Sequence, residues 1–163
     1  MLKKKNKSDT QIINNLMVSG YRVDISDQMH DFLELRQLYN AAMREVRTKL
    51  EILDEEFHVR FNHNPIHHIE CRLKSPQSIV EKLNRKGVEL SIESIKKNIT
   101  DIAGIRVICN YIDDIYTIAD LLLKQDDITL IRERDYIANP KDNGYRSLHL
   151  VIMVPVYLSD RKE

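Results

Sequence analysis

The apolar positions in the first third of the chain recur every three or four residues. Such a repeat forms one face of a helix, and here it predicts a single long helix. Ser26 or Asp27 is the expected N-terminal cap. Pro65 disfavours helical backbone in the residue before it, so the helix should end before Asn64. The predicted buried face consists of Leu35, Leu38, Ala42, Val46, Leu50, Leu53 and Phe57.

Further along the chain, apolar segments bounded by turn residues predict strands joined through shorter helices. The central strand is expected to be buried at residues 100–110, where Ile105 and Val107 alternate with Arg106. The last strand is apolar on both faces, as in a strand inside a sheet. The pattern predicts an α/β fold with a mixed sheet and helices around it. Strands are expected at 66–73, 100–110, 128–135 and 145–157, and helices at 75–87, 91–99 and from Asp113 or Asp114 to Lys124.

Composition narrows the class of protein. The 163 residues are 42% apolar and 31% charged, which fits one globular domain at 26–163 after an N-terminal tail at 1–25. The tail is expected to be disordered or to hold a short helix around residues 12–18. The 25 basic and 25 acidic side chains cancel, so an anion site must come from local clustering. With no signal peptide, no membrane-spanning segment and two distant cysteines, we expect a reduced, cytoplasmic protein.

The start of the helix at residue 75 is the first candidate site. Serine at the cap and proline at the first helical position are a strong helix start, and the free N–H groups of a first turn attract anions. The residues Arg72, Lys74, Ser78 and Lys82 surround it and make a plausible polyphosphate cradle. The alternative interpretation is a basic helix start that meets only water.

The entrance of the central strand is the second candidate site. Asp101 precedes Gly104 and Arg106, and an acid and an arginine there can hold a metal-bound phosphate and a planar base. Gly104 is expected to mark a bend or a close approach by backbone or ligand. A regular strand puts Asp101 and Arg106 on opposite faces, and a bulge would bring them together. A structural ion pair or two solvated residues explain the same pattern.

The polar segment at residues 135–149 is the third candidate site. Pro140, Asn143 and Gly144 predict a tight turn ahead of the last strand. Tyr145 leaves that turn as a stacking platform or, alternatively, as an aromatic plug of the loop. The donors nearby are Lys141, Arg146 and His149.

Three histidines and a cysteine at residues 62–72 invite a zinc hypothesis. Their spacing matches none of the common structural zinc patterns, and no second Cys/His pair follows. We therefore expect a loop that leads into a strand.

Three ordered segments together resemble a known family. RLKSPQSIVEKL (residues 72–83), DIAGIRVIC (101–109) and DYIANPKDNGYRSLH (135–149) are similar to the synthetase domain of RelA/SpoT-type alarmone synthetases, in the small, synthetase-only branch. The resemblance covers about residues 57–157. It implies a nucleotidyltransferase-like fold and transfer of pyrophosphate from ATP to the ribose 3′-hydroxyl of GDP or GTP, which releases AMP and makes ppGpp or pppGpp.

The resemblance also implies residue roles. Asp101 would be the catalytic residue that binds Mg²⁺, and Arg72 and Arg106 would sandwich the adenine. Lys74, Ser78 and Lys82 would hold the ATP phosphates. Tyr145 would stack on guanine, and Lys141, Asn143, Arg146 and His149 would line the acceptor side.

One departure from the family leaves alternatives open. The family's next motif, a glutamate in a segment like E-x-Q-x-R-T, does not occur before Glu163. We therefore expect a synthetase domain that is incomplete at its C-terminus, from an enzyme that forms a homotetramer in full-length form. The alternatives are a catalytically silent nucleotide-binding regulatory module and a relative that pyrophosphorylates the 3′ end of tRNA. Zero net charge argues mildly against a nucleic-acid partner.

Overall fold

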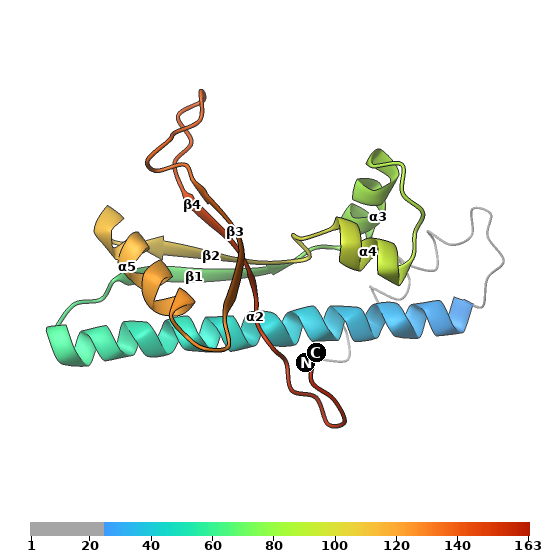
Figure 1. Ribbon diagram of the computed structural model, residues 1–163, viewed down its shortest axis with the longest axis horizontal. Coiled ribbons are helices and arrows are strands. Elements are labelled where there is room, and N and C mark those ends of the chain that lie inside the picture. Colours follow the sequence, from blue (N-terminus) through green and yellow to red (C-terminus); the bar gives the residue numbers. More distant parts are fainter. Residues whose placement is uncertain (1–24) are drawn as a thin grey trace. The chain divides into compact units, whose positions relative to one another are not determined.

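The computed structural model describes residues 25–163, with side chains from His30 onward, and has a mixed α/β fold (Figure 1). The short helix predicted around residues 12–18 lies outside this range. The helices and strands follow one another in the order that the sequence predicted. In order they are α2 (Ile25–Phe61), β1 (Ile66–Leu73), α3 (Pro76–Arg85), α4 (Ile92–Asn98), β2 (Ala103–Cys109), α5 (Ile112–Leu123), β3 (Thr129–Asp135) and β4 (Leu148–Met153).

The long helix α2 confirms the predicted apolar face in part, because Leu38, Ala42 and Phe57 are only half-buried. Leu35, Val46, Leu50 and Leu53 are buried. The helix begins at Ile25, so the prediction that Ser26 or Asp27 caps it is wrong. It ends at Phe61 because Asn62 adopts a left-handed backbone (φ 50°), ahead of Pro65.

The chain divides into two compact units, and each unit has its own apolar core. The first comprises residues up to Asn40 together with Arg72–Gly104, and the second comprises Ala41–Cys71 with Ile105–Glu163. The core of the first unit consists of Leu35, Ile79, Leu83, Ile95, Ile99 and Ile102. The core of the second consists of Val46, Leu50, Leu53, Ile66, Ile118, Leu122 and Ile128.

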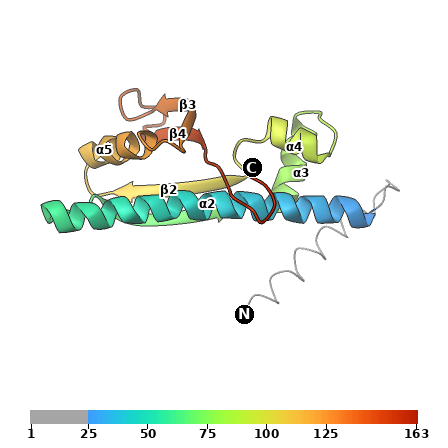
Figure 2. The ribbon, with the colours of Figure 1, turned by 60° about the horizontal axis from the view of Figure 1, so that its bottom comes forward.

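The strands pair as two two-stranded sheets, β1 with β2 and β3 with β4. The N–H of Lys74 donates to Ile102 O and the N–H of Asn110 donates to Pro65 O, so β1 and β2 run antiparallel. β3 and β4 are antiparallel from Thr129 opposite Met153 to Asp135 opposite Leu148, with an irregularity between Leu130 and Arg132. In the second unit α5 lies beside this pair (Figure 2), and the Tyr116 hydroxyl donates to Asp135 Oδ2 at 2.9 Å.

The central strand β2 is half-buried and not fully buried as predicted. Ile105, Val107 and Cys109 turn inward, whereas Arg106 and Ile108 on the other face are exposed. The alternation runs unbroken from Ala103, so no bulge interrupts the strand. A Cβ at Gly104 would lie 3.8 Å from Arg72 O, an ordinary contact that does not demand glycine.

The last strand is shorter than predicted. β4 spans Leu148–Met153 instead of residues 145–157. At its start, the N–H of Tyr145 donates to the Asn143 side chain at 3.1 Å, which keeps Tyr145 in the turn. Beyond its end, Pro155 has no N–H to donate to a ladder.

The cap of α5 also differs from the prediction. Tyr111 is the N-cap and its side chain makes no capping hydrogen bond, whereas Asp113 and Asp114 lie inside the first turn. Carboxylates there still interact favourably with the helix dipole, which explains why the pattern suggested a start two or three residues late. Across residues 25–163, no helix combines the length and the apolar character needed to cross a membrane.

Candidate active site

Helix α3 is fixed at both ends by local chemistry. Ser75 has extended backbone, and its Oγ accepts the N–H of Ser78 at 3.2 Å while Pro76 opens the helix. At the other end Gly87 has φ 65°, its N–H donates to Asn84 O, and the N–H of Val88 donates to Leu83 O. This is a Schellman motif. The predicted start and stop of this helix are therefore confirmed.

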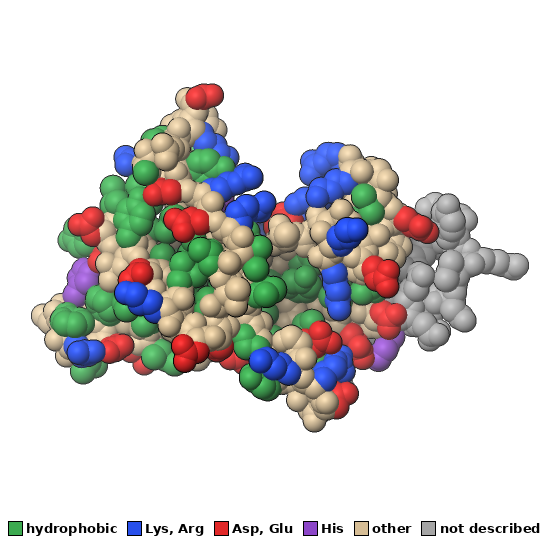
Figure 3. All heavy atoms as spheres, in the orientation of Figure 1, with side chains coloured by type: hydrophobic (Ala, Val, Ile, Leu, Met, Phe, Trp, Pro, Cys, Tyr) green, Lys and Arg blue, Asp and Glu red, His purple; other side chains and the backbone are tan. Residues whose placement is uncertain are grey.

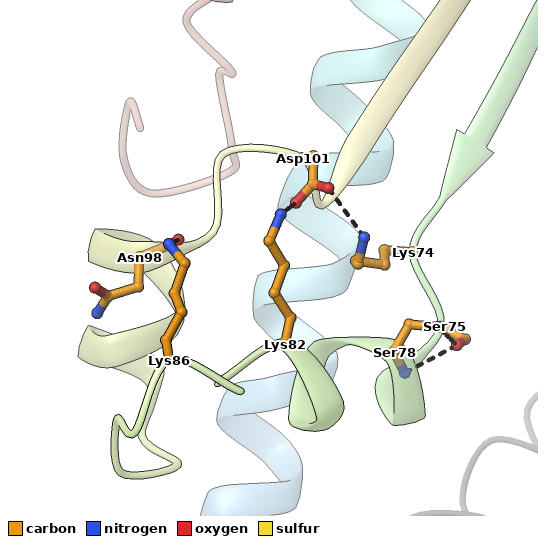
Figure 4. Close-up of polar contacts among 7 residues, drawn as sticks. All are labelled: Lys74, Ser75, Ser78, Lys82, Lys86, Asn98 and Asp101. Atoms are coloured by element: carbon orange, nitrogen blue, oxygen red, sulfur yellow. Dashed lines mark hydrogen bonds and ion pairs between the residues drawn. The ribbon is translucent and has the colours of Figure 1, made fainter. Parts of the chain in front are cut away.

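Two lysines converge on Asp101 from different elements (Figure 4). Lys74 follows β1, and its backbone N–H donates to Ile102 O at 2.7 Å, which holds it beside the approach to β2. Its Nζ lies 3.0 Å from Asp101 Oδ2, and Lys82 Nζ, from α3, lies 2.7 Å from Asp101 Oδ1. The lysine side chains are 21% and 23% exposed and the Asp101 side chain is 51% exposed.

The two lysines set the protonation state of Asp101. Partial burial raises the pKa of this carboxyl group, and it is the largest single effect. The hydrogen bonds from Lys82 and Lys74, together with their positive charges, outweigh burial and lower the pKa of Asp101 below its ordinary value. Asp101 is therefore ionised at neutral pH, and the site carries two positive charges around one negative charge.

This group lines a cavity of about 240 Å³ in the first unit, formed by Lys74, Ser78, Glu81, Lys82, Arg85 and Asp101. In the space-filling view, Lys and Arg side chains gather over α3 (Figure 3). The sequence prediction missed Glu81 and Arg85. Both follow Ser78 at helical spacings of three and seven, so a helical-face analysis of α3 was the signal that would have found them.

The two arginines predicted to bind adenine lie on adjacent strands but in different units. Arg72 is an exposed residue of β1 in the first unit. Arg106 is an exposed residue of β2 in the second unit, where its guanidinium approaches Glu70 Oε2 at 4.0 Å. A weakly paired, exposed guanidinium leaves its planar face accessible for stacking.

In the second unit, aromatic rings and a lysine cluster beside the start of β4. The Tyr145 hydroxyl lies 2.9 Å from His149 Nε2, and Lys141 Nζ lies 5.2 Å from the centroid of the Tyr145 ring. Tyr136 completes the cluster, with its ring centroid 4.5 Å from Lys141 Nζ and 5.3 Å from the His149 ring. The sequence prediction missed Tyr136, although it lies in the same polar segment as Tyr145.

The turn that carries Tyr145 is confirmed. Gly144 has φ 78° and donates its N–H to Lys141 O at 2.8 Å. The side-chain oxygen of Asn143 accepts a hydrogen bond from the N–H of Tyr145, and the guanidinium of Arg146 lies 3.5 Å from Ile137 O. These two predicted site residues therefore stabilise the loop.

His149 is held in its neutral form. Burial first, and then the positive charges of Lys141 and Arg134, lower the pKa of the His149 imidazole below its ordinary value. A neutral imidazole can exchange one hydrogen bond with the Tyr145 hydroxyl and keep its other nitrogen for a ligand.

The histidine-rich segment follows the expected loop-and-strand course. His63 precedes β1, and its Nε2 lies 2.8 Å from Asp114 Oδ1. His67 and His68 are exposed residues of β1. Among the residues that the structure describes, no group of three His, Cys, Asp or Glu side chains is arranged to hold a metal ion.

Comparison with known proteins places the fold and these motifs in one family. Residues 71–162 match the model for the region found in RelA / SpoT proteins. The chain is 43% identical over 140 residues to GTP pyrophosphokinase YwaC of Bacillus subtilis, covering 86% of this chain and 67% of the relative. It is 38% identical over 119 residues to GTP pyrophosphokinase YjbM of the same organism, covering 72% of this chain and 54% of the relative.

A solved structure agrees with these sequence matches. The crystal structure of small alarmone synthetase 1 from Bacillus subtilis, bound to its product pppGpp, superposes with a TM-score of 0.71 at 32% identity. The match covers 81% of this chain and 67% of that chain. This chain therefore belongs to the RelA/SpoT family, and its fold is the nucleotidyltransferase-like fold of the small alarmone synthetases. It spans between about half and two thirds of the length of these relatives.

Proposed function

We propose that the protein is a GTP pyrophosphokinase, which transfers pyrophosphate from ATP to the ribose 3′-hydroxyl of GTP or GDP and releases AMP. Family membership and the names of the relatives support this reaction. The observation that carries the proposal is the convergence of Lys74 and Lys82 on Asp101 in one cavity at the start of α3.

On the donor side, the protein has to supply positive charge, and it does not have to form a covalent bond with the nucleotide. A transferring phosphoryl group must have its negative charge offset, and the attacking and leaving oxygens must be held in line. Lys74 and Lys82 supply two ammonium groups on the cavity wall, and Ser78 supplies a hydroxyl beside the N-terminus of α3. Arg72 and Arg106 would stack on the adenine through their planar guanidinium groups.

The donor set fits a magnesium ion that arrives with the nucleotide. Mg²⁺ prefers oxygen ligands, keeps several waters, and is commonly bound by one or two carboxylates plus substrate phosphates. Asp101 is ionised and half-exposed, and Glu81 lines the same cavity. Asp101 would hold the ion, which when bound would neutralise charge on the phosphates.

The acceptor side would be the cluster around Tyr145. Tyr145 is 40% exposed, and an exposed phenol ring can stack on guanine. Lys141 and Arg146 would offset the acceptor phosphates, and Asn143 and His149 would offer polar contacts. On this proposal Asn143 and Arg146 exchange their present loop contacts for ligand contacts.

The compartment and the oligomeric state are also part of the proposal. We propose a cytoplasmic protein that acts as a homotetramer in its full-length form.

The direct test is a product assay with this chain, ATP and Mg²⁺, in which GDP, GTP or tRNA is the acceptor. Anion exchange should resolve AMP and a guanine nucleotide with two added phosphates, and both should disappear when Mg²⁺ is removed. If AMP forms with tRNA as the acceptor but not with GDP or GTP, the activity is directed at RNA and the proposal is wrong. Tight ATP binding without AMP formation from any acceptor would indicate a silent nucleotide-binding module.

A further inference from the structure

Asp101, the residue proposed to hold the metal, has both of its carboxylate oxygens paired with lysines. Lys74 Nζ lies 3.0 Å from Oδ2 and Lys82 Nζ lies 2.7 Å from Oδ1 (Figure 4). We propose that these two lysines act as an internal counter-cation, which prevents a free divalent cation from binding Asp101 until a nucleoside polyphosphate draws the lysines away. The identity of the polyphosphate rests on the proposed function.

The geometry makes the ammonium groups direct competitors of a metal ion. A divalent cation must contact a carboxylate oxygen at about 2.1 Å. It would then lie within a few ångströms of an ammonium group that contacts the same carboxylate, and the two like charges would repel each other. Because each oxygen has its own lysine, Asp101 offers no oxygen that is free of this competition.

The lysines are held in place by different elements. Lys74 is fixed through its backbone, which donates to Ile102 O at 2.7 Å and accepts from Arg36 NH1 at 3.4 Å. Lys82 projects from α3, which the Ser75 cap and the Gly87 stop define. Loss of one lysine therefore leaves the other in position.

The same lysines face the cavity that is proposed to take the ATP phosphates. An ammonium group has three donors and no acceptor, so a phosphate oxygen can replace the carboxylate as its partner. A polyphosphate that engages Lys74 and Lys82 would release the oxygens of Asp101 for the metal. By linkage, the polyphosphate and the cation should raise each other's affinity for this site.

The test is a titration of the chain with Mn²⁺ in the absence of nucleotide. Electron paramagnetic resonance measures the concentration of free Mn²⁺ and so gives the affinity of the chain for the ion. Lys82→Met removes one competitor with little change in side-chain volume. It should tighten Mn²⁺ binding by about fivefold, the upper end for a partly exposed ion pair. Lys74→Met should act in the same direction through the other oxygen. Adding Asp101→Asn to either variant should abolish the gain.

Arg85→Met is the matched control because Arg85 lines the same cavity, whereas the side chains that pair with Asp101 are those of Lys74 and Lys82. Its loss removes one positive charge and should change Mn²⁺ affinity much less than Lys82→Met does. Equal affinity in wild type and both lysine variants, or an equal gain in Arg85→Met, would overturn the proposal. The Mn²⁺ titration measures no turnover, so its result is independent of the product assay. A failed product assay would refute the synthetase reaction, but it would not refute the competition between the lysines and the metal ion.

Discussion

At the residue scale, Asp101 pairs with two lysines that come from different parts of the chain. Its two lysine partners lie 27 and 19 positions away in the sequence, and all three side chains meet in the same unit. The sequence pattern predicted the phosphate cradle from the helix start and the metal ligand from the strand entrance. It did not predict their direct pairing, because that depends on the hydrogen bond between Lys74 and Ile102, which no local pattern encodes.

The lowered pKa of Asp101 predicts how stability changes with pH. A carboxyl group whose folded pKa is lowered stabilises the fold above its unfolded pKa, about 3.9, and this contribution is lost as pH falls through the folded value. Urea unfolding between pH 7 and pH 2 should therefore show a steeper loss of stability in wild type than in Asp101→Asn. Parallel curves for the two proteins would contradict the paired state of Asp101.

Tyr145 provides a second test at the residue scale. Tyr145→Ala should weaken binding of GDP or GTP by about one stacking interaction, roughly 1–3 kcal/mol, while ATP affinity stays close to wild type. Fluorescent analogues of the two nucleotides measure this separately. Tyr157→Ala is the control, because Tyr157 is also exposed and also has a lysine over its ring. Equal losses for both nucleotides would rule out the stacking role.

At the element scale, the sequence predicted best where local chemistry fixes a boundary. Ser75, Pro76 and Gly87 define α3 as expected, and β1 matches its predicted range, which begins directly after Pro65. β4 was predicted too long, because an apolar pattern does not reveal that the Asn143 side chain retains Tyr145 in a turn. The burial of β2 was overestimated, because the apolar sequence does not show that Arg106 and Ile108 on one face stay exposed.

Gly87 tests the boundary of α3. A Cβ at this position would contact nothing within 4 Å, so the cost of a side chain comes only from the left-handed backbone at φ 65°. Gly87→Ala should lower the free energy of unfolding by about 1 kcal/mol. Gly87→Asn should cost less, because asparagine tolerates this conformation. Gly104→Ala is the control, since its backbone is ordinary. A Gly87→Ala protein as stable as wild type would contradict the Schellman stop.

At the scale of the whole molecule, zero net charge coexists with strong local clustering. Each unit has its own apolar core, and each presents its own group of cations, one around Asp101 and one around Tyr145. Composition predicted a globular domain, and the zero net charge excluded an electrostatic field of one sign over the whole protein. The ordered motifs predicted the family. Glu81 and Arg85 could have been predicted from the helical face that they share with Ser78. Tyr136 was missed because its packing against Lys141 and His149 is not encoded in a short motif.

The central claim is that two phosphates move together from ATP to the guanine nucleotide. The most direct measurement uses ATP labelled with ³²P at the β-phosphate, incubated with the chain, Mg²⁺ and GDP. Pyrophosphate transfer predicts that the β label appears in the guanine nucleotide in wild type and not in Asp101→Asn. Transfer of the γ-phosphate alone would leave the label in ADP. A β label that stays in ADP, or that never leaves ATP, would contradict the account.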